Sequence, residues 1–171
     1  TSFAGGIANE DFKTAESVMD IVQGERKDQK YYFVTQGNVE LVDGVPTQKY
    51  TNTAKRLNDE DAKDADGNQL YVQVWDEDKK KMVDSSEKLV NQGLKTVMTA
   101  QVKDTANKLL AKTDWMVIRK AERDVAIPSA TATYRAAVIT ECARLETAIA
   151  NAADVDALAT VMAGQDWPKE D

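Results

Sequence analysis

The sequence predicts an α+β protein in which a β-rich N-terminal region, residues 1–84, precedes an α-helical C-terminal domain, residues 85–171. Two patterns indicate this fold class. Short segments of alternating apolar residues, separated by Gly, Asn and Asp, fill the first part of the chain. Apolar residues at intervals of three and four fill the second part. We therefore expect small β-hairpins with one short helix, followed by a helical hairpin or bundle.

The front region starts with a helical pattern and continues with strand patterns. Residues 9–23 carry acids in the first turn and apolar residues at helical spacing, which predicts a short helix. Residues 31–35 and 39–42 are rich in strand formers, and residues 36–38, Gln-Gly-Asn, are typical of a hairpin turn. With a further turn at Asp43-Gly44, we expect a two- or three-stranded meander.

A second hairpin is expected over residues 70–83, where apolar and polar residues alternate around a loop at residues 76–80. A lone hairpin is marginal in water, so these strands need a sheet partner, a helix or another chain. The polar stretch before them resembles a calcium loop but lacks two anchoring ligands, because Ala62 and Gln73 replace the needed acids. We expect a polar turn there and no metal.

The remaining residues have helical periodicity. Asp84 and Glu87 resemble a capping box, which predicts a helix from residue 85 to about residue 112. A short helix is expected over residues 114–123 after Thr113, and a longer one over residues 130–151. A final helix is expected from its N-cap Asp154 through Ala163, with Gly164 beyond it. The apolar stripe of the longer helix consists of Tyr134, Val138, Cys142, Leu145 and Ile149.

Charge and composition exclude several classes of partner. The net charge is -7, and residues 1–84 carry 17 acidic residues against 11 basic ones, which disfavours binding to nucleic acid. No apolar stretch approaches the roughly 20 residues of a membrane helix. The first residues lack the basic start and apolar core of a signal peptide, and the single cysteine excludes an intramolecular disulfide. We expect a cytoplasmic protein that binds neither nucleic acid nor membrane.

Enzymatic chemistry is equally hard to place. The chain has no histidine, which removes the Ser-His-Asp and Cys-His systems and the usual zinc and iron ligands. It has no glycine-rich nucleotide-binding motif. Paired carboxylates are numerous, but none is marked as a catalytic pair, and Cys142 on its apolar stripe is best explained as a buried structural thiol. We expect no cofactor, no metal and no catalysis.

The most specific stretch of the sequence is Leu109 to Val138. Trp115 and Arg119 are four residues apart, so the guanidinium can lie over the indole. Asp114, Arg119 and Glu122 can form ion pairs along the same helical surface, and for Glu122 a surface ion pair is the better explanation. Trp115 and Tyr134 are expected to anchor the corner between two helices, whereas packing explains Arg135 less easily.

These residues resemble the phage tail assembly chaperones, also called tail fibre assembly proteins. The resemblance is carried by "LLAKTDW" at residues 109–115, "YRAAV" at residues 134–138 and the Trp167-Pro168 pair near the C-terminus. It departs from the family after Tyr-Arg, where a common "YRQALRD" is replaced by "YRAAVIT", and it hardly covers residues 1–84. Chaperones of this family help a fibrous tail protein to fold and trimerise, and some relatives stay attached to the particle.

The resemblance implies a non-enzymatic fibre chaperone that works in the host cytoplasm during assembly or remains on the virion tail. Its partner is a phage tail fibre or another tail protein, with a homo-oligomer also open. Trp, Tyr and Arg are enriched at binding hot spots. The alternatives are a permanent component of a tail, baseplate or fibre attachment, a two-carboxylate cell-wall hydrolase, and a helical adaptor from outside phages. The expected partner-binding residues are Asp114, Trp115, Arg119, Tyr134, Arg135 and Trp167.

Overall fold

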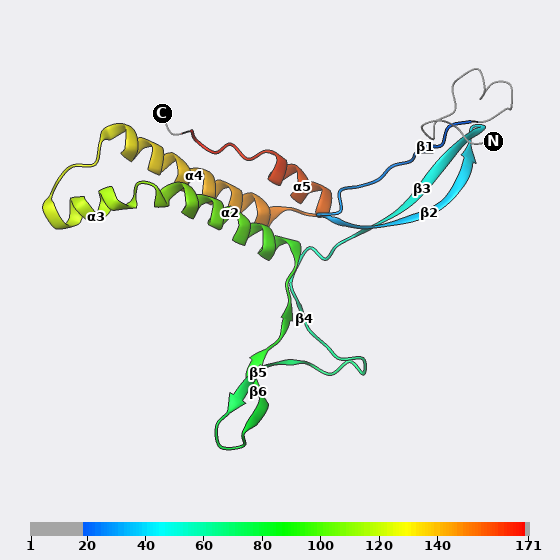
Figure 1. Cartoon of the computed structure of the whole chain (residues 1–171), viewed down its shortest axis with the longest axis horizontal. Coiled ribbons are helices and arrows are strands. Elements are labelled where there is room, and N and C mark those ends of the chain that lie inside the picture. Colours follow the sequence, from blue (N-terminus) through cyan, green and yellow to red (C-terminus); the bar gives the residue numbers. More distant parts are fainter. Residues whose placement is uncertain (1–18, 170–171) are drawn as a thin grey trace, which may run out of the picture. The chain divides into compact units, whose positions relative to one another are not determined.

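A computed structural model of the chain describes residues 19–169 and has the predicted α+β composition, with strands first and helices after them (Figure 1). The chain divides into two compact units, Thr1–Ala54 and Lys55–Asp171. The second unit therefore contains both the later strands and the helices. None of the helices between residues 19 and 169 is long and apolar enough to cross a membrane.

The first unit contains a three-stranded sheet of β1 (Val22–Gln23), β2 (Tyr32–Val42) and β3 (Val45–Ala54) in the order β1-β3-β2. β2 and β3 form an antiparallel hairpin, whereas β1 is parallel to β3. The sheet is therefore three-stranded, as one alternative expected, but it is not a simple meander. Of the expected helix over residues 9–23, residues 9–18 lie outside the described part of the chain, and Val22–Gln23 is a strand.

The predicted turn at residues 36–38 is wrong, because β2 continues through it with a bulge between Gln36 and Val39. The Gln48 side-chain amide donates to the Gly37 carbonyl oxygen at 2.7 Å, and the Gln36 amide donates to Gln48 at 2.9 Å. The hairpin turns instead at Asp43-Gly44, where both residues have positive φ angles of 50° and 80°. A two-residue Asp-Gly loop matches the twist of the flanking strands and is the stronger signal.

The second unit begins with two small antiparallel strand pairs: β4 (Glu60–Asp61) with β7 (Val90–Asn91), and β5 (Tyr71–Asp76) with β6 (Lys81–Lys88). The expected second hairpin is confirmed. The helix expected to start at residue 85 does not start there, because β6 continues to Lys88 and Asp84 lies opposite Gln73 across the pair. The Glu87 amide donates to Ser85 Oγ at 3.0 Å, so no capping box forms with Asp84.

The first helix of this unit, α2 (Leu94–Ala111), starts where a distant segment satisfies its N-terminus. Asp59 accepts hydrogen bonds from the Gly93 amide at 2.6 Å and from the Thr96 hydroxyl at 2.9 Å, and the Gly93 bond is the main cause of a lowered Asp59 pKa. A Cβ on Gly93 would lie 2.3 Å from the Asn58 carbonyl carbon, so only glycine fits. Residues 56–59 therefore set the position of the helix start.

The chain then continues as α3 (Asp114–Arg123), α4 (Ser129–Asn151) and α5 (Val155–Ala163), with bounds close to those predicted. α2 and α4 lie side by side (Figure 1) and are antiparallel, because Lys95 at the start of α2 donates to the Ala150 carbonyl oxygen at the end of α4 at 2.8 Å. Asp154 caps α5 as expected by accepting from the Ala157 amide at 2.8 Å. The fully buried side chains of this helical unit are Val102, Val138, Leu145, Ile149 and Leu158.

Candidate functional site

Four residues form the corner between α2, α3 and α4: Leu110, Thr113, Asp114 and Arg135. One guanidinium nitrogen of Arg135 donates to the Leu110 carbonyl oxygen at 2.8 Å and to Thr113 Oγ1 at 2.7 Å. The other pairs with the Asp114 carboxylate at 2.9 Å. Arg135 thus satisfies a carbonyl at the end of α2 and holds the first residue of α3. These bonds give Arg135 the structural role that the sequence alone did not indicate.

Tyr134 anchors this corner, as predicted. It is only 9% exposed and packs with Ala106 of α2 and Val138 of α4. Leu109, Leu110 and Trp167 pack against the same cluster. The prediction that Tyr134 lies in the corner is therefore confirmed: Tyr134 supplies apolar contact there, and the neighbouring Arg135 supplies hydrogen bonds.

Trp167 is part of a C-terminal tail that folds back onto the helices. Its indole N–H donates to Gln165 at 2.8 Å. The tail is held by Glu141, which accepts from the Asp166 amide at 2.8 Å and forms a two-bond pair with Arg144 at 2.6 and 2.7 Å. Arg144 also donates to the Gly164 carbonyl oxygen at 2.9 Å. Trp167 therefore supports the cluster around Tyr134 rather than standing free.

Sequence reasoning missed Glu141, although a signal was present. The residue lies three after Val138 and four before Leu145, which is a buried position of the apolar stripe, and an arginine follows it at the third position. Its side chain is almost fully buried. The bonds from Arg144, and after them the Asp166 amide, lower the pKa of Glu141 below its ordinary value despite the opposing effect of burial.

The helix α3 carries the exposed part of the site. Trp115 and Ile118 are 52% and 57% exposed, and none of the ten residues of α3 is buried. The Arg119 guanidinium lies 4.8 Å from the Trp115 ring centre, so the predicted stacking is confirmed. The prediction that Trp115 packs in the corner is wrong, because α3 extends away from the cluster. We call Trp115, Ile118 and Arg119 the α3 face.

The ion pairs of α3 also differ from the predicted ones. Asp114 pairs with Arg135 of α4 instead of a residue on its own helix, since its position in the first turn places it beside the corner. Lys120 pairs with Asp124, which ends α3 in a left-handed conformation. Glu122 is in none of the ion pairs found among residues 19–169, so a surface ion pair for that residue stays a prediction.

The described residues form no cluster that could hold a metal ion, and their single cysteine is not activated. Within residues 19–169, no three acidic or cysteine side chains gather to hold a metal ion. Cys142 is partly buried, and burial, followed by the neighbouring Glu146, raises the pKa of its thiol. A raised pKa lowers the thiolate fraction at neutral pH, which makes this cysteine a poor nucleophile.

No family model matches this chain, and neither a curated protein nor a solved structure matches it. Of the six residues expected to bind a partner, the structure brings Asp114, Tyr134, Arg135 and Trp167 into or against the corner, where they hold the helices together. Trp115, which is half exposed, and Arg119, which is partly buried, lie on the α3 face.

Proposed function

We propose that the chain is a phage tail fibre assembly chaperone that binds a fibre protein and aids its folding or trimerisation. The single observation that supports this most strongly is the α3 face, an exposed tryptophan and isoleucine on a helix whose start is fixed by the corner. The residues of the family resemblance, Thr113 to Trp115 and Tyr134-Arg135, are the ones that build this arrangement. The same motif thus connects the resemblance with a binding surface.

The energetics of α3 favour a binding role. A ten-residue helix is marginal by itself in water, so its order depends on the corner. A helix that is ordered before it binds loses less conformational entropy in the complex. Tryptophan and arginine are typical hot-spot residues, and here they already stack on each other. A fibre segment that covers Trp115 and Ile118 would remove their apolar surface from water.

As a chaperone the chain needs a surface and no reacting group, and it would act in the host cytoplasm during assembly. The acidic front region fits this role, since net charge keeps a free chaperone soluble and limits promiscuous association. The partner in this proposal is a polypeptide, with no cofactor, nucleic acid or lipid involved.

Co-expression with a phage tail fibre gene tests the proposal. We expect the full chain to increase the fraction of soluble, trimeric fibre, measured by size-exclusion chromatography and native gels. The double variant Trp115→Ala/Ile118→Ala should lose this effect. Val117→Ala, which changes an exposed apolar residue elsewhere on α3, is the matched control and should keep it. Fibre that trimerises equally well without the chain refutes the proposal.

The second candidate is a permanent component of the virion tail, and the β2–β3 hairpin favours it. Phe33 and Leu41 on β2 are largely exposed, Leu41 at 74%, although both are large and apolar. Such hairpins are typical of subunits that neighbouring chains complete. The chain at fixed stoichiometry in purified virions supports this candidate, whereas its absence from virions, with soluble fibre still dependent on it, supports the transient chaperone.

A further inference from the structure

Arg119 on α3 is held in place by an aromatic ring rather than by an acid. Its guanidinium lies 4.8 Å from the Trp115 ring centre, and its side chain is partly buried. Within residues 19–169 its Nε is the one buried side-chain nitrogen or oxygen that makes no hydrogen bond, and Arg119 is in none of the ion pairs found there. Buried polar groups are usually satisfied, so an ordered but unpaired guanidinium indicates a missing acceptor.

Two other arginines of the helical unit have acceptors for their guanidinium groups. Arg135 pairs with a carboxylate and with two more oxygens at the corner, and Arg144 forms a two-bond pair with Glu141. Arg119 has an acid within reach on its own helix, since Glu122 follows three residues later, but no ion pair joins the two. An acceptor for Arg119 therefore has to come from outside α3.

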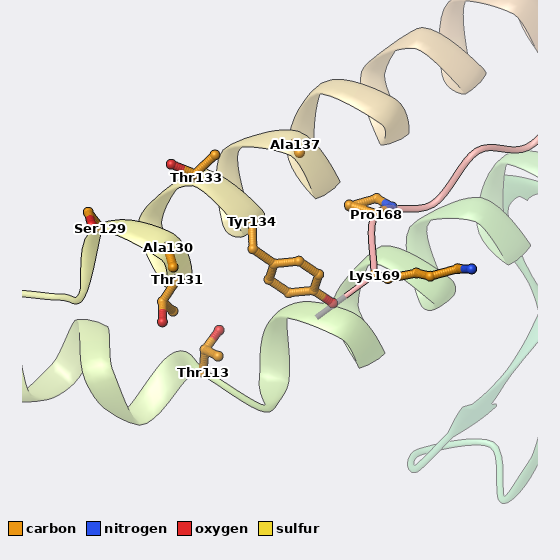
Figure 2. A pocket seen from close by; sticks show the side chains of 9 residues that line it. All are labelled: Thr113, Ser129, Ala130, Thr131, Thr133, Tyr134, Ala137, Pro168 and Lys169. Atoms are coloured by element: carbon orange, nitrogen blue, oxygen red, sulfur yellow. The ribbon is translucent and has the colours of Figure 1, made fainter. Parts of the chain in front are cut away.

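The pocket beside the corner is a poorer place for an acidic ligand than the α3 face. This pocket of about 470 Å³ lies between the start of α4 and the tail (Figure 2). Among the described residues that line it, the only charged one is the exposed Lys169, and Figure 2 shows its side chain pointing away from the Tyr134 ring. The Thr113 hydroxyl in the pocket is already bonded to Arg135 and Leu110. An ordered cation without a partner is therefore offered by α3 and not by this pocket.

The stack on Trp115 makes Arg119 a better anion binder than an ordinary surface arginine. A surface ion pair usually contributes little, because two flexible side chains lose entropy and water screens their charges. The guanidinium of Arg119 is already ordered by the ring, and part of it is shielded from water. Its planar donors fit the two oxygens of a carboxylate. A carboxylate should therefore bind Arg119 more tightly than Arg123, which is exposed one turn further along α3.

The local charge selects a singly charged group. Arg119, Glu122 and Arg123 sum to one positive charge, and the other charged residues of α3, Asp114 and Lys120, are each paired. One net positive charge matches a carboxylate. A phosphate group carries about two negative charges at neutral pH and would be repelled more strongly by Glu122. The exposed apolar surface beside Arg119 further requires that the carboxylate belongs to a segment with apolar residues.

We propose that Arg119 recognises a glutamate or aspartate side chain on the polypeptide segment whose apolar residues cover Trp115 and Ile118. This specificity rests on the proposed function, which places a foreign polypeptide on the α3 face. Trp115 then has two roles, since it contacts the segment and also positions the Arg119 guanidinium for the carboxylate. Arg119 thus selects an acidic segment among segments of equal apolarity.

Peptide titration of the full chain, followed by NMR of the α3 amides and of the Arg119 Nε–H signal, tests this proposal. The probe is N-acetyl-Leu-Glu-Leu-Leu-amide, and N-acetyl-Leu-Gln-Leu-Leu-amide is its uncharged match. We expect saturable shifts with both peptides and about tenfold tighter binding of the glutamate peptide. Arg119→Gln should remove this preference and leave the weaker binding of the glutamine peptide unchanged. Arg123→Gln loses the same charge from the same helix and is the matched control, which should keep most of the preference.

The comparison of the two peptides separates recognition from stability. If Arg119 only stabilised α3, Arg119→Gln would weaken the binding of both peptides equally, and that result contradicts the proposal. Arg119→Lys keeps the charge but loses the planar donors, so it should retain only part of the preference. Glu122→Gln removes a nearby negative charge and should strengthen binding of the glutamate peptide.

Each of four further results overturns the proposal: no saturable shift with the glutamate peptide, equal affinity for the two peptides, tighter binding of inorganic phosphate than of the glutamate peptide, or an Arg119 Nε–H signal that shifts when the chain alone is concentrated. The last result would place a second copy of the chain on the α3 face. None of these measurements needs a fibre. A failed co-expression assay together with a clear glutamate preference removes the chaperone function and leaves Arg119 as the recognition residue, whereas the opposite pair of results removes only the role of Arg119.

Discussion

The β2–β3 hairpin and the α2–α4 pair differ in how far they bury their apolar side chains. In the helical pair, the apolar stripe is covered, and Val102, Val138 and Leu145 are completely buried. In the hairpin, Phe33 and Leu41 are exposed on long strands, and no strand residue is fully buried. The helical pair is thus stabilised by its own core, whereas the hairpin leaves large apolar side chains such as Leu41 mostly exposed. Burial of apolar surface therefore stabilises the helical pair far more than the hairpin.

Truncation of one leucine in each region sharpens this comparison most. Leu145→Ala in α4 should destabilise the protein by about 2–5 kcal/mol, because it leaves a cavity in a closed core. Leu41→Ala in β2 should change the free energy of unfolding by less than about 0.5 kcal/mol. Urea denaturation followed by circular dichroism measures both. A cost for Leu41→Ala as large as that for Leu145→Ala would break the comparison, since it would mean that β2 is covered in solution.

Loss of the Arg135 guanidinium should destabilise the protein less than loss of the Leu145 side chain. Arg135→Met keeps much of the side-chain length but removes the bonds to Leu110, Thr113 and Asp114. We expect a loss of about 1.5–3 kcal/mol, because charged hydrogen bonds are lost and a partly buried carbonyl is left unpaired. Hydrogen exchange of the α3 amides should accelerate more than that of the α4 amides. Arg123→Met at the exposed end of α3 is the matched control and should have almost no effect on either measurement.

Local signals in the sequence were enough for most of the helices and for one hairpin. The bounds of α3, α4 and α5 follow from apolar spacing, and the β5–β6 hairpin follows from alternation. Among these three helices only α5 has a side-chain cap, from Asp154, whereas the Thr113 hydroxyl before α3 donates to Leu110 instead of capping. The start of α2 does not, because Asp59 caps it from 34 residues away. The course of β2 was missed because Gln36-Gly37-Asn38 has turn chemistry, and only pairing with β3 decides that it forms a bulge.

The candidate site divides in the same way. Tyr134 was placed correctly, since its apolar ring follows the helical stripe. The role of Arg135 was not predictable, because its partners Leu110 and Thr113 are 25 and 22 residues away in the sequence. Trp115 was expected to anchor the corner together with Tyr134, yet its indole is half exposed on α3. The residue types of Tyr134, Arg135 and Trp115 indicated that these positions are important, but the role of each depends on tertiary contacts that the sequence does not show.

The acid sensitivity of the helical unit should depend on Glu141. Its folded pKa is lowered by Arg144 and the Asp166 amide, so its contribution to stability is complete above the ordinary pKa of about 4.5. That contribution disappears as the pH falls below 4.5 and through the folded pKa. Glu141→Gln should therefore cost about 1–2 kcal/mol at neutral pH and almost nothing in strong acid. Thermal melting over this pH range, with the exposed Glu122→Gln as control, measures the difference. A constant cost at every pH would contradict the assigned role.

The smallest expected effect is that of Trp115→Ala on stability. Half of the indole is in water, and the Arg119 stack at 4.8 Å is an exposed cation–π contact worth about 0.5–1 kcal/mol. We expect a total loss below about 1 kcal/mol in thermal melts at low protein concentration, although the same change removes fibre assistance. A loss of about 3 kcal/mol or more would show that the indole is buried in solution. If that loss grew with protein concentration, a second copy of the chain would be covering the α3 face, and the division between a stabilising core and a recognition surface would fail at α3.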